Sequence, residues 1–152
     1  MKKIVTFIAC LILIFILISC KSNKENYITP SEDDILDKEL VLKIDNIEVN
    51  AIWIDNDSTK SLKQLAKNVL TINLEMYGGM EQFGGIGSRL PSNDKEQTAV
   101  AGDIMLYQSN KIVLFYGSNT WSYTKLGHIN LSQSELTNIL GISDVTIELS
   151  LK

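Results

Sequence analysis

Cysteine, histidine and arginine are scarce in this chain of 152 residues, which contains two cysteines, one histidine and a single arginine. Cys10 lies inside an apolar N-terminal run and Cys20 follows it, so a folded domain after Cys20 contains no cysteine. Thiol catalysis and cysteine-bound metal are therefore excluded there, and the domain must rely on an apolar core instead of disulfides. His128 alone cannot form a site with several histidine ligands, and we expect neither a metal nor a cofactor.

Positive charge is also in short supply. The net charge is −4, and it becomes −6 if an N-terminal segment carrying Lys2 and Lys3 is removed. Nucleic-acid binding needs clustered positive side chains, so this acidic chain with one arginine, Arg89, argues against a nucleic-acid partner. The same balance argues against electrostatic adhesion to anionic lipid.

The N-terminus has the pattern of a secretory signal. Residues 4–18 form a nearly unbroken apolar run after Lys2 and Lys3; as a helix it would extend ~22 Å, too short for ~30 Å of hydrocarbon. The sequence Leu17-Ile18-Ser19-Cys20 resembles a bacterial lipobox, in which the cysteine sulfur receives a diacylglycerol. We predict a lipoprotein signal peptide at residues 1–19, lipidation of Cys20 and a lipid-anchored location in the bacterial cell envelope. An ordinary cleaved signal or an uncleaved anchor is the alternative.

A polar segment follows the predicted lipidation site. Residues 20–37 contain Pro30 and an acidic cluster, which is typical of a flexible tether. The remaining residues 38–152 are sufficient for one folded domain and too few for two.

Alternation of apolar and polar side chains predicts a mostly-β domain. The turn-prone pair Asp45-Asn46 indicates a β-hairpin between the first two strands. Residues 112–115 are apolar at every position, which is typical of a strand buried on both faces, as in a barrel covered by a helix. Residues 92–101 are polar and are expected to form a loop. Strands are expected at residues 40–44, 47–53, 70–77, 103–107, 111–116, 122–129 and 145–151.

Two helices are predicted between these strands. Ser58 can cap the first, whose positions 62, 65, 66 and 69 form one apolar face. The second begins with a capping box, in which Ser132 and Glu135 each satisfy a free backbone N–H of the other. About seven strands and two helices indicate a closed or half-closed β-barrel.

Residues 77–123 hold most of the glycines and most of the aromatic residues of the domain. Glycine lets the backbone adopt φ > 0 or approach another group closely, so this density marks specialised loops between strands. Binding surfaces are often built on such loops. We predict a groove for a peptide or small-molecule ligand formed by residues 77–89 and 116–123. The candidate ligand-binding residues are Tyr77, Met80, Glu81, Phe83, Arg89, Tyr116 and Trp121.

Several charged residues allow more than one interpretation. Arg89 could clamp a carboxylate or a peptide carbonyl, or it could pair with Glu81 or Asp94 as a structural pin. Glu81 could form an acid–base pair with Asp94 or Asp103, although the spacing does not require one. His128 fits a surface or capping position. We assign no catalytic residue.

Three segments, MYGGMEQFGGIGSRLPSND, AGDIMLYQSNKIVLFYGSN and TWSYTKLGHI, together resemble the bacterial cyclophilin-like domain family. The resemblance spans residues 40–152. It implies a closed eight-stranded β-barrel with a helix at each end, in agreement with the count above. It implies no activity, because these domains are largely uncharacterised.

Cyclophilins isomerise X–Pro bonds with an arginine, in a Phe-His-Arg strand, that hydrogen-bonds the prolyl nitrogen. The matching strand here, residues 70–77, reads LTINLEMY and has neither histidine nor arginine. We therefore predict a lipid-anchored domain that binds a ligand without an intact cyclophilin catalytic motif. The alternative is a cell-envelope peptidyl-prolyl isomerase with a rearranged site, since the ~20 kcal/mol barrier needs only desolvation and one well-placed donor.

Overall fold

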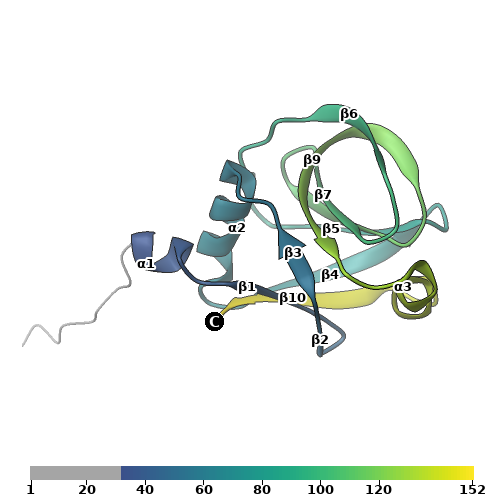
Figure 1. Cartoon of the computed structure of the whole chain (residues 1–152), viewed down its shortest axis with the longest axis horizontal. Helices are drawn as coiled ribbons and strands as arrows, with labels where there is room; N and C mark the ends of the chain where they lie inside the picture. Colours follow the sequence, from purple (N-terminus) through teal and green to yellow (C-terminus); the bar gives the residue numbers. More distant parts are fainter. Residues whose placement is uncertain (1–31) are drawn as a thin grey trace, which may run out of the picture.

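The computed structural model describes residues 32–152, which form a strongly curved β-sheet with α1 and α2 on one side and α3 on the other (Figure 1). The predicted signal peptide, the lipidation site Cys20 and most of the predicted tether lie outside these residues. No helix in the described part of the chain is long and apolar enough to cross a membrane. The elements are α1 (Glu32–Leu36), β1 (Leu40–Ile44), β2 (Ile47–Val49), β3 (Ala51–Trp53), α2 (Asp57–Ala66), β4 (Leu70–Tyr77), β5 (Glu81–Gly85), β6 (Lys95–Ala99), β7 (Asp103–Tyr107), β8 (Lys111–Phe115), β9 (Asn119–Ile129), α3 (Gln133–Leu140) and β10 (Val145–Leu151).

The consecutive strands β2 and β3 nearly close this sheet into a barrel. Hydrogen-bonded neighbours follow the order β2-β1-β10-β4-β5-β8-β7-β9-β3. β2 and β3 stand at opposite ends of that order, yet only Asn50 separates them in the sequence. The prediction of a mostly-β barrel is confirmed. The structure has ten strands within residues 32–152, three more than the seven expected, because the strand expected at residues 47–53 divides at Asn50 and because β5 and β6 are added.

The first hairpin turns as its sequence indicates. Asp45 and Asn46 both have positive φ, 46° and 69°, which is the backbone of a type I′ turn. The Asp45 carboxylate also accepts a hydrogen bond of 2.8 Å from the backbone N–H of Thr146 on β10. The turn therefore also holds β1 against its other neighbour in the sheet.

Strand β8 is buried on both faces, as its apolar sequence predicts, and its neighbour β7 is buried on both faces as well. Alternate residues such as Ile104 and Leu114 belong to the main core of the barrel. The intervening residues form a second cluster, the outer cluster, which consists of Ala99, Met105, Val113, Phe115 and Tyr123. Because Ala99 and Tyr123 come from β6 and β9, the cover of this face is a pair of strands. The expectation of a covering helix is wrong.

β6 and residues 119–123 of β9 form this cover, which we call the β6–β9 ribbon. The polar sequence of β6 predicts a loop, and that prediction is wrong. The strand forms because its backbone pairs with β9 from Lys95↔Tyr123 to Ala99↔Asn119. Only Ala99 among its five residues is fully buried, so its other side chains can remain polar.

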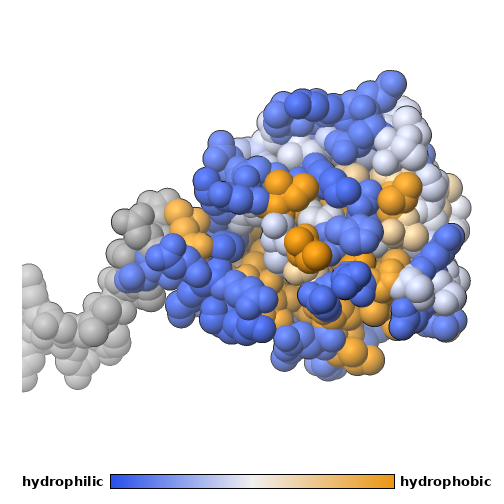
Figure 2. Space-filling view, in the orientation of Figure 1, coloured by the Kyte–Doolittle hydropathy of each residue, from blue (hydrophilic) through white to orange (hydrophobic). Residues whose placement is uncertain are grey.

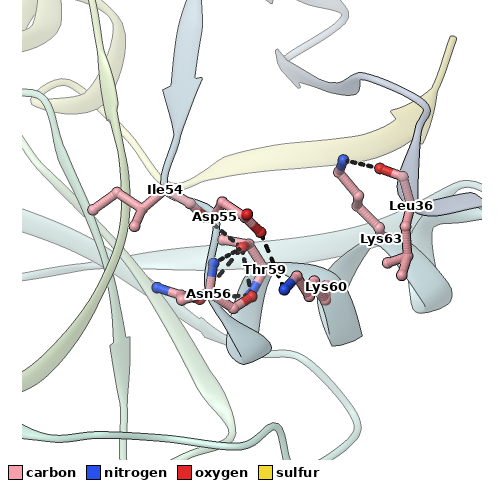
Figure 3. Close-up of polar contacts among 7 residues, drawn as sticks. All are labelled: Leu36, Ile54, Asp55, Asn56, Thr59, Lys60 and Lys63. Atoms are coloured by element: carbon pink, nitrogen blue, oxygen red, sulfur yellow. Dashed lines mark hydrogen bonds and ion pairs between the residues drawn. The ribbon is translucent and has the colours of Figure 1, made fainter.

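Some of the polar contacts of α1 and α2 are made by residues that precede the predicted helix, among them Leu36 and Asn56 (Figure 3). Asn56 is the N-cap of α2: its side chain accepts a 2.9 Å bond from Thr59 N–H. Ser58, the expected cap, instead donates a 2.6 Å hydrogen bond to Pro91 O. At the other end of the helix, Lys63 Nζ donates to Leu36 O at 2.7 Å. α1 thus occupies part of the expected tether, and the chain is folded from Glu32 onward.

Helix α3 begins with the capping box that the sequence predicts. The Ser132 N–H donates to Glu135 Oε2 at 2.8 Å, and the Glu135 N–H donates to the Ser132 hydroxyl at 3.3 Å. Its apolar residues Leu136 and Leu140 are buried in the main core. At the other end, Gln82 of β5 donates to the carbonyl of Leu140, so the C-terminal end of the helix is fixed to the barrel wall.

Exposed apolar side chains are scattered over the surface. Ile52 and Ile54, on and just after β3, are 62% and 40% exposed. On the face that carries β3, Figure 2 shows separate hydrophobic patches set among hydrophilic surroundings. Single exposed apolar residues are normal on soluble domains and do not indicate a binding surface by themselves.

Candidate functional site

An aromatic cavity of about 550 Å³ lies where the β6–β9 ribbon meets the outer face of β5 and β8. It receives side chains from the end of β4, from β5, β7 and β8, and from the first half of β9. We call it the aromatic cavity; it is lined by Tyr77, Met80, Glu81, Phe83, Tyr107, Lys111, Val113, Asn119, Trp121 and Tyr123. Its volume is in the range of small-ligand sites.

Its rim and its floor are both aromatic. Tyr77 and Trp121 are 62% and 58% exposed, whereas Tyr123 is only 3% exposed. The Tyr77 and Phe83 rings meet edge to face, with centroids 5.8 Å apart. Tyr107 and Tyr123 make a similar contact at 6.0 Å. These contacts hold the rings in place before any ligand arrives.

Glu81 is the only carboxylate in the lining, and it is 7% exposed. Burial raises the pKa of Glu81, and a hydrogen bond from the Asn119 side chain offsets this only in part. Oε2 of Glu81 has no hydrogen-bond partner among residues 32–152. A buried acceptor without a partner costs about 1–3 kcal/mol and is uncommon in folded proteins. Because Glu81 lines the cavity, a ligand bound there can supply the missing partner once the carboxylate turns toward it.

Tyr123 shares the surroundings of Glu81. Its pKa is raised by burial, then by the negative charge of Glu81, although a hydrogen bond from Asn119 opposes the rise. The Asn119 amide donates to the Tyr123 hydroxyl at 3.2 Å. Tyr123 therefore stays neutral at physiological pH and presents a phenol to the cavity.

Lys111 provides the only positive charge in the lining. Its ammonium lies 5.4 Å from the centroid of the Tyr107 ring and donates to Gln108 Oε1 at 3.1 Å. On the paired strands β5 and β8, Glu81 faces Phe115 and Gly85 faces Lys111, four residues farther along each strand. Four residues of strand span ~13 Å, so the acidic and basic groups lie toward opposite ends of the cavity.

A glycine turn places Met80 and Glu81 at the cavity wall. Gly78 and Gly79 have positive φ, 60° and 65°, between β4 and β5. The Met80 carbonyl accepts a 2.8 Å hydrogen bond from Gly117 N–H, and a Cβ on Gly117 would lie 2.7 Å from the Cβ of Met80. Gly117 therefore permits a close approach that any larger residue would prevent.

The structure brings five of the seven candidate residues together around the aromatic cavity. Tyr116 instead is 5% exposed and belongs to the main core. Arg89 is exposed and does not line the cavity. Within the described part of the chain it forms no ion pair with Glu81 or Asp94, so the interpretation of Arg89 as a structural pin is wrong. The five residues that line the cavity are Tyr77, Met80, Glu81, Phe83 and Trp121.

The seven candidate residues include only half of the lining. Of the other five lining residues, Asn119 and Tyr123 lie within the predicted segment 116–123, whereas Tyr107, Lys111 and Val113 lie outside both predicted segments. A usable signal exists for Asn119 and Tyr123. Asn119, Trp121 and Tyr123 recur with period 2, the spacing of one face of a strand, but that strand was expected to begin only at residue 122.

A second buried carboxylate, Asp103, lies outside the cavity. Its Oδ1 accepts from Lys125 Nζ at 2.7 Å and is 3.0 Å from His128 Nδ1. Burial tends to raise the pKa of Asp103, but the hydrogen bonds from Lys125, His128 and Val100 N–H outweigh it and lower that pKa. A bulge in the β7–β9 pairing, between Ile104 and Met105, brings residues 125 and 128 to the same carboxylate.

Neither of the acid–base pairs considered for Glu81 forms. Asp103 is held by Lys125 and His128, and Asp94 accepts a 2.6 Å hydrogen bond from Thr124. Neither aspartate lines the aromatic cavity with Glu81. Residues 32–152 contain no group of three or more His, Cys, Asp or Glu side chains arranged to hold a metal ion.

Comparison with known proteins gives one match. A model of the cyclophilin-like family matches residues 42–151, nearly the whole barrel. No curated protein and no solved structure matches the chain significantly.

Proposed function

The chain belongs to the cyclophilin-like family, and on this basis we propose that its barrel is a ligand-binding domain without the cyclophilin catalytic motif. The ligand, a peptide or small molecule, would bind in the aromatic cavity. The observation that carries the proposal is a preformed aromatic cavity whose wall contains the buried, partly unsatisfied carboxylate of Glu81.

The chemistry of the lining favours binding over catalysis. It contains neither a histidine nor an arginine, and its only carboxylate has no acidic neighbour in the cavity. β4 has neither the histidine nor the arginine of a Phe-His-Arg strand. Rigid aromatic rings and one charged group are the usual elements of a recognition site.

Calorimetric titration of the full chain in nonionic detergent, with hits from a peptide and small-molecule screen, tests this proposal. Trp121→Ala is expected to lower affinity at least about tenfold, because it removes an exposed ring of the cavity rim. Ile52→Ala is the matched control, since Ile52 is similarly exposed and does not line the cavity. Ligands that bind both variants alike would place the site elsewhere.

Prolyl isomerisation is the second candidate, because an aromatic cavity in a cyclophilin-like barrel can accept a proline ring. A protease-coupled proline-peptide assay distinguishes the two. We expect no acceleration. Acceleration lost in Arg89→Ala would establish a relocated catalytic arginine, and acceleration lost only in Trp121→Ala would place isomerisation in the aromatic cavity.

We further propose that a lipid on Cys20 anchors the domain in the bacterial cell envelope. The supporting observation is the lipobox-like sequence before Cys20. Cys20→Ser should abolish incorporation of labelled fatty acid and release the protein from the membrane fraction. Cys10→Ser, within the apolar run, should change neither. Membrane retention of Cys20→Ser would indicate an uncleaved N-terminal anchor.

A further inference from the structure

The aromatic cavity combines two features that together select for positive charge. Its lining contains five aromatic rings, whose faces attract cations through their quadrupoles. Its only carboxylate, Glu81, lies within the same wall. Aromatic rings alone would accept any apolar group, and a carboxylate alone would accept any hydrogen-bond donor. The combination fits a desolvated cation best.

The state of Glu81 supports this assignment. The side chain is 7% exposed, and Oε2 has no partner among the described residues. The terminal torsion of a glutamate is broad, so either oxygen can turn toward the cavity at little cost. A neutral apolar ligand would leave this carboxylate buried without a countercharge, whereas a cation would supply one.

Lys111 indicates where in the cavity the cation would bind. Its ammonium already lies over the Tyr107 ring, 5.4 Å from the centroid. A second cation would be repelled from that end and attracted to Glu81, ~13 Å away along the strands. The two charges therefore orient a ligand along the cavity.

Resting on the proposed function, we infer that the aromatic cavity recognises a cationic group, an alkylammonium or guanidinium, which pairs with Glu81 between the rings of Tyr77, Phe83 and Trp121. The group can belong to a peptide side chain or to a small amine. Both present the same chemistry to the cavity.

The test uses choline and its uncharged isostere 3,3-dimethyl-1-butanol, titrated into the ¹⁵N-labelled full chain in nonionic detergent. The indole N–H of Trp121 reports on the cavity, and that of Trp53 is an internal reference because Trp53 does not line it. We expect choline to shift the Trp121 signal with at least about tenfold higher affinity than the neutral isostere. Equal affinities would overturn the inference.

Glu81→Gln keeps the shape of the side chain and removes its charge. It should weaken choline binding at least about tenfold and leave the neutral isostere unaffected. Glu96→Gln is the control, because Glu96 on β6 is exposed and lies outside the lining. Choline binding unchanged in Glu81→Gln would overturn the inference.

The pH dependence gives a readout that a purely structural role would not produce. Choline affinity should rise with pH through the raised pKa of Glu81 and then level off, and Glu81→Gln should abolish the rise. The other titratable groups around the cavity are Tyr77, Tyr107, Tyr123 and Lys111. Affinity that does not change between pH 4 and 8 would contradict the pairing.

The outcomes separate this inference from the proposed function. If both probes shift Trp121 equally, in the wild type and in Glu81→Gln, the cavity binds apolar ligands and only the cation preference is wrong. If neither probe shifts Trp121 and no screened peptide or small molecule does so, the proposed binding function is wrong as well.

Discussion

Two buried carboxylates in this barrel have opposite surroundings. Asp103, at the start of β7, is contacted by Lys125, His128 and the backbone N–H of Val100, and its pKa is lowered although burial opposes this. Glu81, at the start of β5, has an unpartnered oxygen, and burial raises its pKa. One carboxylate is satisfied by the fold and holds strands together. The other is only partly satisfied by residues 32–152.

Removing the charge of Asp103 should have the largest effect. Asp103→Asn is expected to lower the free energy of unfolding by about 2–3 kcal/mol, because it disrupts charge-assisted hydrogen bonds to a side chain that is 3% exposed. Urea unfolding at pH 7 measures this. Asp55→Asn is the control, since Asp55 is 86% exposed in its pair with Lys60 and should change stability by less than about 0.5 kcal/mol. Equal losses of unfolding free energy in the two variants would show that the hydrogen bonds of Asp103 do not stabilise the fold.

Lys125→Met should make Asp103 more like Glu81. We expect a loss of about 1 kcal/mol, limited because Lys125 is 37% exposed and its charge is partly screened. Asp103 contributes stability above its unfolded pKa, and this is lost as the pH falls through its lower folded pKa. Without Lys125 that folded pKa rises, so the acid loss should begin at higher pH. NMR titration of the Asp103 carboxylate checks this, and an unchanged midpoint would contradict it.

Glu81→Gln should act in the opposite direction, with a gain of roughly 1 kcal/mol or less at pH 7, since it removes a buried charge that lacks a countercharge. The folded pKa of Glu81 is raised, so its destabilising effect is absent below the unfolded pKa and grows as the pH rises through the folded value. The gain should therefore vanish near pH 4. Urea unfolding of wild type and variant at both pH values measures it. A loss of stability at pH 7 would mean that Glu81 is satisfied within the fold.

Glu135→Gln should have the smallest effect. Hydrogen bonds from the Ser132 hydroxyl and backbone N–H lower the pKa of Glu135, but the carboxylate is fully exposed at the start of α3. The small loss of stability expected at pH 7 should disappear as the pH falls through that lowered value. Thermal unfolding checks it. A loss of stability as large as that of Lys125→Met would show that the exposure of a carboxylate does not determine how much it contributes to stability.

The candidate site was predictable where a local sequence feature marks it, the glycine turn after Tyr77 and the aromatic segment that contains Trp121. Met80, Glu81 and Phe83 follow the glycine turn that marks the site, and the structure places them together. Tyr107, Lys111 and Val113 belong to ordinary strand patterns, and nothing in those patterns says that their outer face forms a cavity wall. Tyr116 could not be assigned, because a single residue of register decides whether it faces the main core or the ribbon.

The sequence by itself determined the local elements of the barrel. β4 and β10 follow from period-2 alternation, the Asp45-Asn46 turn from residues that tolerate positive φ, and the start of α3 from its capping box. Each depends on residues within a few positions of one another. Only the tertiary structure made a strand of the polar segment β6, because its partner in β9 lies about 25 residues away. The tertiary structure also decided the different surroundings of Asp103 and Glu81, since the pairing of distant strands determines whether a buried carboxylate contacts a cationic side chain or lines a cavity.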